Sequence, residues 1–342
     1  MFNSLSKNSV LVANYPFATI DPNIGIVNVP DNRLIRLAEI YKSDRIVPAT
    51  VKFIDIAGLV AGASRGEGLG NQFLAHIRST AVIVEVVRAF KNDQVTHVSN
   101  QINPKEDISV INTELVLADL MTLKRRLDQL SKEAKADPKL NPQLELLTQA
   151  YGLLNDNRPL YPNLDTASLE KLHDLQPLSA KPIIFLFNIG EDEITDSSKQ
   201  NALAEIVAPA PAIFVSAKLE SELVSLSDSD AAELRESYAI KRSGLIDLIS
   251  LAYKTLGLQS FLTAGEKEVR AWTIPVGSSA PKAAGTIHSD FERGFIAAEI
   301  VSYGDLDTLG SFAAAKAAGK VRTEGKDYIV QPNDVIEFRF NN

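Results

Sequence analysis

The stretch Val51-Lys-Phe-Ile-Asp-Ile-Ala-Gly-Leu59 decides the fold class of this 342-residue chain. It begins as a run rich in β-branched and aromatic residues, which predicts a rigid β-strand, and continues into Asp55 and a turn at Gly58. Nucleotide-hydrolysing proteins present a carboxylate to Mg²⁺ in this way. Glycine lets the backbone N–H approach a terminal phosphate because no side chain stands in the way. We therefore predict that Asp55 binds magnesium and that Gly58 contacts the phosphate.

Three further apolar runs follow, at residues 82–87, 183–187 and 212–215. Each is nearly continuous rather than alternating, which is typical of parallel strands covered by helices on both faces. Helical patterns lie between them. The sequence therefore predicts an α/β fold with a doubly wound, mostly parallel sheet.

Between residues 108 and 154 the apolar residues recur in steps of four and three, as in the seam of a coiled coil. The seam consists of Val116, Leu120, Leu123, Leu127, Leu130 and Ala134, and then of Leu140, Leu144, Leu147, Tyr151 and Leu154. Prolines at 138 and 142 break the pattern, so we expect an antiparallel helical hairpin inserted into the sheet domain. Two ordinary surface helices are the alternative.

From residue 260 onward, short strand candidates alternate with Gly, Pro and Asp turns, and one helical stretch lies among them. This pattern predicts a small α+β module. The expected organisation is a nucleotide-binding domain over 1–102 and 178–257, a helical coiled-coil insertion over 103–177, and the module over 258–342.

Composition narrows the class of protein. The formal net charge of −8 and the pI near 5.2 argue against a broad nucleic-acid-binding surface, but they allow a local basic patch. The absence of cysteine excludes thiolate metal sites, and four scattered histidines argue against zinc. No apolar run reaches the roughly 20 residues that a membrane span requires. We expect a cytoplasmic protein with no membrane partner and no free DNA as partner.

Other segments fit the same nucleotide site. Thr19 lies in a proline-bounded loop, where its hydroxyl can complete a magnesium shell. The segment Asn188-Ile-Gly-Glu191 ends one strand run and Ser216-Ala-Lys218 ends the next, where a nucleotide base would lie. The predicted magnesium ligands are Thr19 and Asp55, and the predicted nucleotide-binding residues are Gly58, Asn188, Ile189, Glu191, Ser216, Ala217 and Lys218.

The base-reading segment departs from the N-K-x-D pattern of guanine-specific proteins. Ile189 replaces the lysine and the longer Glu191 replaces the aspartate that accepts hydrogen bonds from guanine. Adenine carries an acceptor where guanine carries its ring N–H, so an altered loop favours ATP over GTP. Adenine would then be held by Asn188 and by the backbone around Ile189.

Catalysis requires a group that orients water. Leu59 occupies the place where many related hydrolases carry glutamine, and leucine cannot polarise water. His97, in a loop after a strand, is the candidate because a neutral imidazole can orient water or accept its proton. A solvent-facing loop histidine is the alternative. The glycines between 62 and 70 predict a mobile switch segment.

The chain resembles the YchF, or Obg-like ATPase, family along essentially its whole length. The resemblance rests on Ala13-Asn-Tyr-Pro-Phe-Ala-Thr-Ile-Asp-Pro-Asn23, on the segment from Asp55 to Phe73, on Val269-Arg-Ala-Trp-Thr-Ile-Pro-Val276 and on Gly285-Thr-Ile-His-Ser-Asp-Phe-Glu-Arg-Gly-Phe295. It implies a P-loop nucleotide-hydrolysing domain, a helical-hairpin insertion and a C-terminal TGS domain. It further implies Mg²⁺ as cofactor, ATP as the preferred nucleotide with GTP as the alternative, and ribosome binding in translation or stress control. The family roles fall on Thr19 for magnesium, Asn188 and Ile189 for adenine, and His97 for hydrolysis.

One family motif does not occur in the sequence. No G-x-x-x-x-G-K-[ST] phosphate loop is present, and residues 1–5 resemble the helix that follows it. Since that loop supplies most of the phosphate binding, we expect an N-terminally incomplete nucleotide domain. Residues 1–342 alone should bind ATP weakly or not at all and be marginally folded.

A different function is also compatible with the sequence. A non-catalytic protein could bind ribosomes through the hairpin and the TGS domain. A modest basic cluster in the module consists of Lys316, Lys320, Arg322 and Lys326 and is a candidate for ribosome contact. An ordinary solvated face is the alternative for this cluster.

Overall fold

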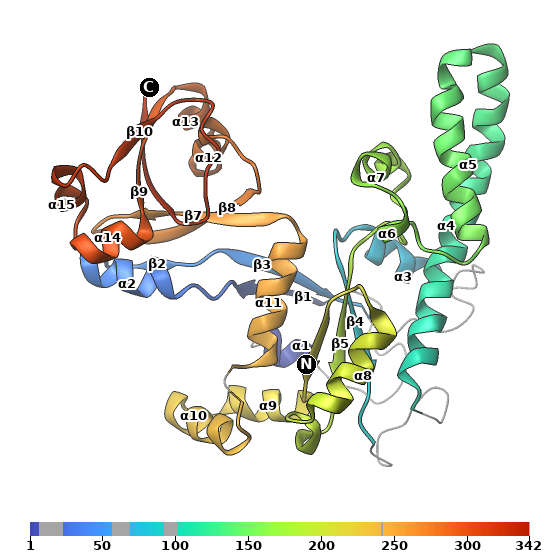
Figure 1. The fold of residues 1–342 in the computed structure, drawn as a ribbon, viewed down its shortest axis with the longest axis horizontal. Coiled ribbons are helices and arrows are strands. Elements are labelled where there is room, and N and C mark those ends of the chain that lie inside the picture. Colours follow the sequence, from blue (N-terminus) through green and yellow to red (C-terminus); the bar gives the residue numbers. More distant parts are fainter. Residues whose placement is uncertain (7–22, 57–68, 92–101, 241, 342) are drawn as a thin grey trace. The chain divides into compact units, whose positions relative to one another are not determined.

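The computed structural model describes residues 1–6, 23–56, 69–91, 102–240 and 242–341 (Figure 1). The chain forms two compact units, one of Met1–Gly25 and Phe53–Leu245 and one of Ile26–Lys52 and Ile246–Asn342. Strands β1 (Asn23–Asn28) and β3 (Thr50–Asp55) form a two-stranded sheet. The division between the units falls within both strands.

The first unit contains a parallel sheet in the order β4-β5-β6. The strands are β4 (Ile83–Arg88), β5 (Ile183–Asn188) and β6 (Ala212–Val215). They match the three apolar runs to within a residue, so the predicted α/β fold with parallel strands is confirmed. Among the described residues, β3 is hydrogen-bonded to β1 and belongs to a separate sheet from β4.

Helices cover the parallel sheet. Phe185 and Phe187 of β5 pack with Leu203 and Val207 of α8 (Ser197–Val207). Another cluster joins Leu74 to residues of the helical insertion. The remaining helices of this part are α1 (Phe2–Ser6), α3 (Leu69–Arg78), α9 (Ala217–Ser225) and α10 (Asp228–Ser237). The short 3-10 turn η4 (Glu191–Glu193) follows β5.

The insertion is a long helical hairpin, as expected. Helix α4 (Pro104–Ala136) and helix α5 (Asn141–Asn155) lie side by side, joined by the 3-10 turn η2 (Pro138–Leu140) (Figure 1). The seam residues predicted from the period form its core, with Leu123, Leu130 and Leu147 almost fully buried. The insertion ends with α6 (Leu160–Asn163), α7 (Thr166–Lys171) and η3 (His173–Leu175).

A buried carboxylate fastens the hairpin to the sheet. Asp119 of α4 is fully buried and accepts hydrogen bonds from the backbone N–H groups of Leu178 and Ser179, at 2.8 and 2.7 Å. The Ser179 hydroxyl donates a third bond at 2.7 Å. Because Leu178 and Ser179 precede β5, the middle of α4 is held close to the start of the central strand.

The second unit contains a six-stranded mixed sheet in the order β10-β9-β11-β7-β8-β2. Its strands are β2 (Ile46–Val47), β7 (Leu258–Ala264), β8 (Val269–Pro275), β9 (Phe295–Ser302), β10 (Arg322–Glu324) and β11 (Asp334–Phe340). Its helices are α2 (Asn32–Tyr41), α11 (Gly244–Thr255), α12 (Ala280–Ile287), α13 (Ser289–Arg293), α14 (Tyr303–Leu309) and α15 (Phe312–Ala317). The core lies around Phe261, Ile300 and Ile336, with α12 packed on it. We call this unit the C-terminal module.

The segment Ile26–Lys52 belongs to the C-terminal module, whereas the expected boundaries place it in the nucleotide-binding domain. Strand β2 pairs in parallel with β8. Arg36 of α2 forms an ion pair with Asp307 at 2.6 Å, and Arg33 donates to the Asn333 side chain at 2.9 Å. These contacts join segments far apart in sequence, so a reading of local patterns does not reveal them. Among the described residues, no helix has both the length and the apolar character of a membrane span.

Candidate functional site

The structure describes seven of the predicted site residues. They are Asp55, Asn188, Ile189, Glu191, Ser216, Ala217 and Lys218. Thr19, Gly58 and His97 lie outside the described residues, so their roles stay predictions.

Asp55 is the last residue of β3, as the strand prediction requires. Burial by its surroundings raises the pKa of its carboxyl group, and the nearby α-amino group of Met1 acts in the opposite direction. A bound cation would stabilise the ionised form of a carboxyl group that has lost part of its hydration. The chemistry of Asp55 therefore fits a magnesium ligand. The described residues contain no group of three or more metal-binding side chains, so the role of Asp55 as a magnesium ligand stays a prediction.

The ends of β5 and β6 are fastened together at Asn188. The Asn188 side-chain oxygen accepts a hydrogen bond from the backbone N–H of Ala217 at 2.9 Å. The backbone N–H of Ile189 donates to the Val215 carbonyl at 2.8 Å. These contacts fix the direction of the Asn188 side chain, whose amide N–H₂ group has no hydrogen bond with a described residue.

The side chain of Ile189 lies in the core, and its backbone N–H group is already hydrogen-bonded. Its side chain is 2% exposed and packs in the core with Phe185 and Phe187. Because its N–H group already bonds to Val215, only its carbonyl can receive a hydrogen bond from a base. An apolar residue is therefore required here by packing as well as by any recognition of adenine.

Glu191 lies in η4, just beyond the end of β5. One of its carboxylate oxygens, Oε2, forms an ion pair with Lys218 Nζ at 2.8 Å. The hydrogen bond to Glu191 raises the pKa of Lys218. The other oxygen, Oε1, is buried and has no hydrogen-bond partner among the described residues. Lys218 thus orients a carboxylate that keeps one acceptor free.

Ser216 is a structural residue in this arrangement. It is 3% exposed and caps α9, since its hydroxyl accepts a hydrogen bond from the Leu219 N–H at 3.4 Å. On the same helix, buried Glu220 accepts hydrogen bonds from the Ser243 hydroxyl at 2.7 Å and from the Gly244 N–H at 2.8 Å. Sequence reasoning missed Glu220, because its partners lie more than twenty residues away.

Gly244 explains why the start of α11 can lie so close to β6. A Cβ atom at this position would meet Val215 Cγ1 at 2.4 Å and the Phe214 carbonyl oxygen at 2.9 Å. Any larger residue would have to displace β6, the strand that ends just before Ser216. Gly244 therefore helps to position the loop at the end of β6.

Glu85 is a second residue that sequence reasoning missed. It lies within β4, is 8% exposed, and its Oε2 atom has no hydrogen-bond partner among the described residues. Burial, and then the negative charge of Asp107, raise the pKa of Glu85 to about 8. The signal was present in the sequence, since an acidic residue interrupts an otherwise apolar strand.

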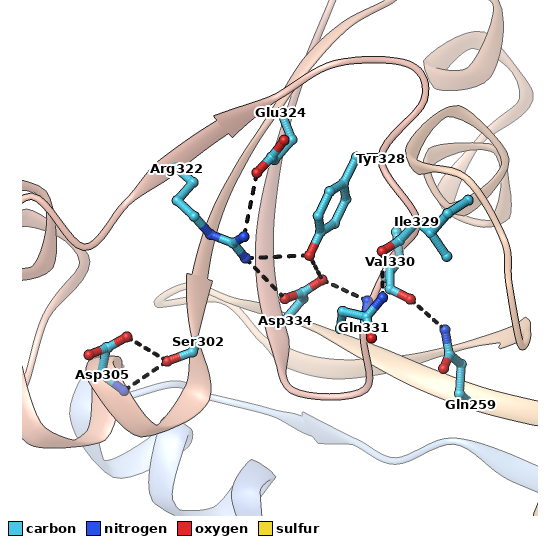
Figure 2. A network of polar contacts seen from close by, with 10 residues as sticks. All are labelled: Gln259, Ser302, Asp305, Arg322, Glu324, Tyr328, Ile329, Val330, Gln331 and Asp334. Carbon is cyan, nitrogen blue, oxygen red and sulfur yellow. Dashed lines mark hydrogen bonds and ion pairs between the residues drawn. The ribbon is translucent and has the colours of Figure 1, made fainter.

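The predicted basic cluster of the C-terminal module is largely paired within the chain. Lys316 contacts Glu299 at 3.0 Å and Lys320 contacts Asp305 at 3.3 Å. Figure 2 shows Arg322 between Glu324 and Asp334, at 3.5 and 3.9 Å. Only Lys326 of the cluster has no ion pair to a described residue.

A buried network lies behind this cluster. Asp334 is 3% exposed and accepts hydrogen bonds from the Tyr328 hydroxyl at 2.8 Å and from the Gln331 N–H at 2.7 Å (Figure 2). The Gln259 side chain donates to the Val330 carbonyl at 2.7 Å. These hydrogen bonds hold the loop between β10 and β11 in place. The buried carboxylate of Asp334 therefore contributes to the stability of the C-terminal module.

Two family models match the chain. Residues 258–341 match YchF-GTPase_C, described as a protein of unknown function (DUF933), and residues 1–119 match the family described as 50S ribosome-binding GTPase. The chain is 47% identical to proteins named ribosome-binding ATPase YchF from Pasteurella multocida and Bacillus subtilis, covering 100% of this chain and 95% of each relative.

Two solved structures are also similar to the chain. The YchF GTPase of Schizosaccharomyces pombe superposes with a TM-score of 0.84 at 36% identity, over 99% of this chain and 93% of that chain. A GTP-binding protein from Pyrococcus horikoshii has a TM-score of 0.59 at 17% identity, over 99% of this chain and 96% of that chain, and shares the fold.

Proposed function

The chain belongs to the YchF family, and on this premise we propose that it is a ribosome-associated nucleotide switch that hydrolyses ATP, in preference to GTP, to ADP and phosphate. The names of its relatives support both the ribosome partner and the hydrolysis. The match of residues 1–119 to 50S ribosome-binding GTPases supports the same class of reaction. Such a role belongs in the cytoplasm.

The observation that carries the nucleotide preference is the carboxylate of Glu191. Its buried oxygen Oε1 has no partner among the described residues, and Lys218 holds the other oxygen. Because Lys218 holds Oε2, the carboxylate does not present both oxygens to the ring N–H and the amino group of guanine, as the N-K-x-D aspartate does. Its free oxygen Oε1 can accept a hydrogen bond from the exocyclic amino group of adenine and repels the carbonyl oxygen that guanine carries at that position. The Asn188 amide can donate to a ring nitrogen that both purines share, so it supports binding without discriminating between them.

Each remaining role follows from residue chemistry or from the family resemblance. Asp55 and Thr19 would hold Mg²⁺, which when bound neutralises charge on the phosphates. Gly58 would contact the terminal phosphate through its backbone. His97 would orient the attacking water, because Leu59 offers no polar atom for that task.

Phosphate release from ATP and GTP, with and without ribosomes, tests the proposal. We expect a higher kcat/KM for ATP. In the Glu191→Gln variant this preference should fall by about tenfold, because an amide can rotate its N–H₂ group toward the guanine carbonyl oxygen. Asp192→Asn is the matched control, since Asp192 lies in the same turn and is exposed.

Two chains should be compared, residues 1–342 and the same residues preceded by a G-x-x-N-x-G-K-S-T loop. The added loop should strengthen ATP binding in calorimetry, because its backbone and lysine contact the phosphates. If the extended chain splits neither ATP nor GTP, and neither nucleotide raises its Tm, the hydrolase proposal fails. Ribosome binding without hydrolysis would then support the non-catalytic alternative.

A further inference from the structure

Five exposed basic side chains follow one another along the far half of the hairpin. Four of them, Lys124, Arg125, Lys132 and Lys135, lie on α4, and Lys139 lies in the turn that follows. None of the five has an ion pair with a described residue. The ion pair within α4 joins Arg126 to Glu133 at 3.3 Å, and Gln129 also donates to Glu133 at 2.7 Å. We call these five residues the hairpin stripe.

Helical geometry brings the stripe onto one face of α4. At about 3.6 residues per turn, the four α4 members fall within a sector of roughly 100°, and the first and last lie about 16 Å apart along the axis. Asp128 is the acidic residue of this sector. The buried residues Leu123, Leu130 and Ala134 lie on another side of the helix, and the two leucines pack in the core of the hairpin.

The charge of this region differs from that of the chain. Residues 121–140 contain six basic and three acidic side chains, a net charge of +3, while the whole chain carries −8. The neighbouring helix α5 contains a single charged residue, Glu145. The far half of the hairpin, residues 121–155, thus keeps a net charge of +2 from six basic and four acidic side chains, whereas the whole hairpin, residues 104–155, carries −1 from seven basic and eight acidic side chains.

We propose that the hairpin stripe binds the phosphate backbone of ribosomal RNA. The proposal rests on the ribosome association proposed above and names the surface that makes the contact. A row of unpaired cations over about three turns of helix suits a chain of phosphates, each of which can lie against a different lysine. Lysine provides a point charge, so we expect contacts that position the protein and read no base sequence.

An anionic membrane is a poorer match to the same surface. A helix that lies on a membrane needs a broad apolar face next to its basic residues. The apolar side of α4 is buried in the hairpin, and Met121 is the exposed large apolar residue beside the stripe. The stripe face of α4 is therefore charged but lacks a broad apolar surface that could insert into a membrane.

Ribosome co-sedimentation over a range of salt concentrations tests the proposal with the full chain. The variant Lys124→Gln/Lys132→Gln/Lys135→Gln removes three cations that have no partner in the described structure. Lys254→Gln/Lys267→Gln/Lys282→Gln is the control, because it removes the same charge from exposed positions elsewhere. The stripe variant should bind at least tenfold more weakly, and its plot of log affinity against log salt should be shallower by about two to three units.

Melting curves and ribosome-free phosphate release should be the same for wild type and both variants, which shows that folding and the nucleotide site are intact. A stripe variant that binds ribosomes as tightly as wild type, with the same salt slope, would overturn the inference and leave the proposed function standing. An equal loss in both variants would also overturn it, since only net charge would matter.

A second arm uses deproteinised ribosomal RNA and vesicles that contain phosphatidylserine, each titrated with wild type and both variants. Weaker RNA binding by the stripe variant alone supports the inference even if intact ribosomes are not bound, in which case the proposed function fails separately. Equal RNA binding by all three proteins contradicts it. Stripe-dependent binding to vesicles and not to RNA assigns the surface to a membrane and contradicts it as well.

Discussion

The C-terminal module and the helical hairpin use basic side chains in opposite ways. In the module, Lys316 and Arg339 both contact Glu299, which is 7% exposed, at 3.0 and 2.5 Å. In the hairpin, Lys132 and Lys135 are exposed and have no ion pair with a described residue. A cluster of cations in a sequence therefore does not show whether those cations are available to a partner.

The difference has a structural cause. The module buries carboxylates on its central strands, with Glu299 on β9 and Asp334 on β11, and a buried carboxylate requires compensating donors. The hairpin beyond Asp119 is a leucine seam, and its described residues 121–155 bury no carboxylate. The five cations of the hairpin stripe are exposed and have no ion pair with a described residue, so they are available to a polyanion.

The largest expected effect comes from removing both cations that compensate Glu299. Lys316→Ala/Arg339→Ala leaves a buried carboxylate unpaired, so the free energy of unfolding should fall by about 3–5 kcal/mol. Chemical denaturation measures it. Lys132→Ala/Lys135→Ala in the hairpin is the matched control. Equal losses in the two double variants would abolish the distinction between the regions.

The second effect concerns Glu85, a buried carboxylate of the first unit without a compensating cation among the described residues. Its pKa is raised from an ordinary 4.5 to about 8, so the folded chain keeps a proton that the unfolded chain releases. The free energy of unfolding should therefore decrease as pH rises through this window, by roughly 2 kcal/mol between about pH 6 and 8.

Glu85→Gln should remove that part of the pH dependence, because the amide does not ionise. Denaturation at a series of pH values measures the difference between wild type and variant. Asp107→Asn should weaken the dependence without abolishing it, since the charge of Asp107 is the lesser cause of the shift. If the free energy of unfolding changes with pH in the same way for wild type and Glu85→Gln, the Glu85 carboxyl group does not have a raised pKa in the folded protein.

A smaller effect is expected in the network of the module. Tyr328→Phe removes the hydroxyl that donates to Asp334 at 2.8 Å, while the Gln331 N–H still compensates the carboxylate. The expected loss is about 1 kcal/mol in the free energy of unfolding. Tyr161→Phe in the insertion is the control, because this side chain is 41% exposed and its hydroxyl has no hydrogen bond with a described residue. No difference between the two variants would show that the network adds nothing to stability.

The smallest expected effect on stability concerns the lysines of the hairpin stripe. Neutralising Lys124, Lys132 and Lys135 together should change the free energy of unfolding by no more than about 0.5 kcal/mol in total, since exposed side chains without an ion pair to a described residue contribute little. Thermal melting at low and moderate salt measures this. A loss comparable with that of the Glu299 partners would mean that the stripe stabilises the fold and is not free for RNA.

Part of the fold could be predicted from local patterns. The strand that ends at Asp55, the three parallel strands and the hairpin seam all appear at the expected residues. Burial repeats along a strand or a helix with a fixed period, so neighbouring residues are enough to recognise it. The same reasoning placed Asn188 and Ser216 at strand ends.

The site itself was only partly accessible to such reasoning. The orientation of Asn188 depends on a hydrogen bond from Ala217, and the free oxygen of Glu191 depends on Lys218, which lies on a different element. The burial of Glu85 and the role of Glu220 also depend on distant neighbours. Thr19, Gly58 and His97 stay predictions, because they lie outside the described residues.

The sequence by itself determined the α/β class, the hairpin, the family and the positions of the candidate carboxylates, because these follow from local periodicity and short motifs. Only the tertiary structure decided that the segment Ile26–Lys52 joins the C-terminal module and which cations are already paired. A charge becomes structural or available according to the groups that distant parts of the chain bring beside it.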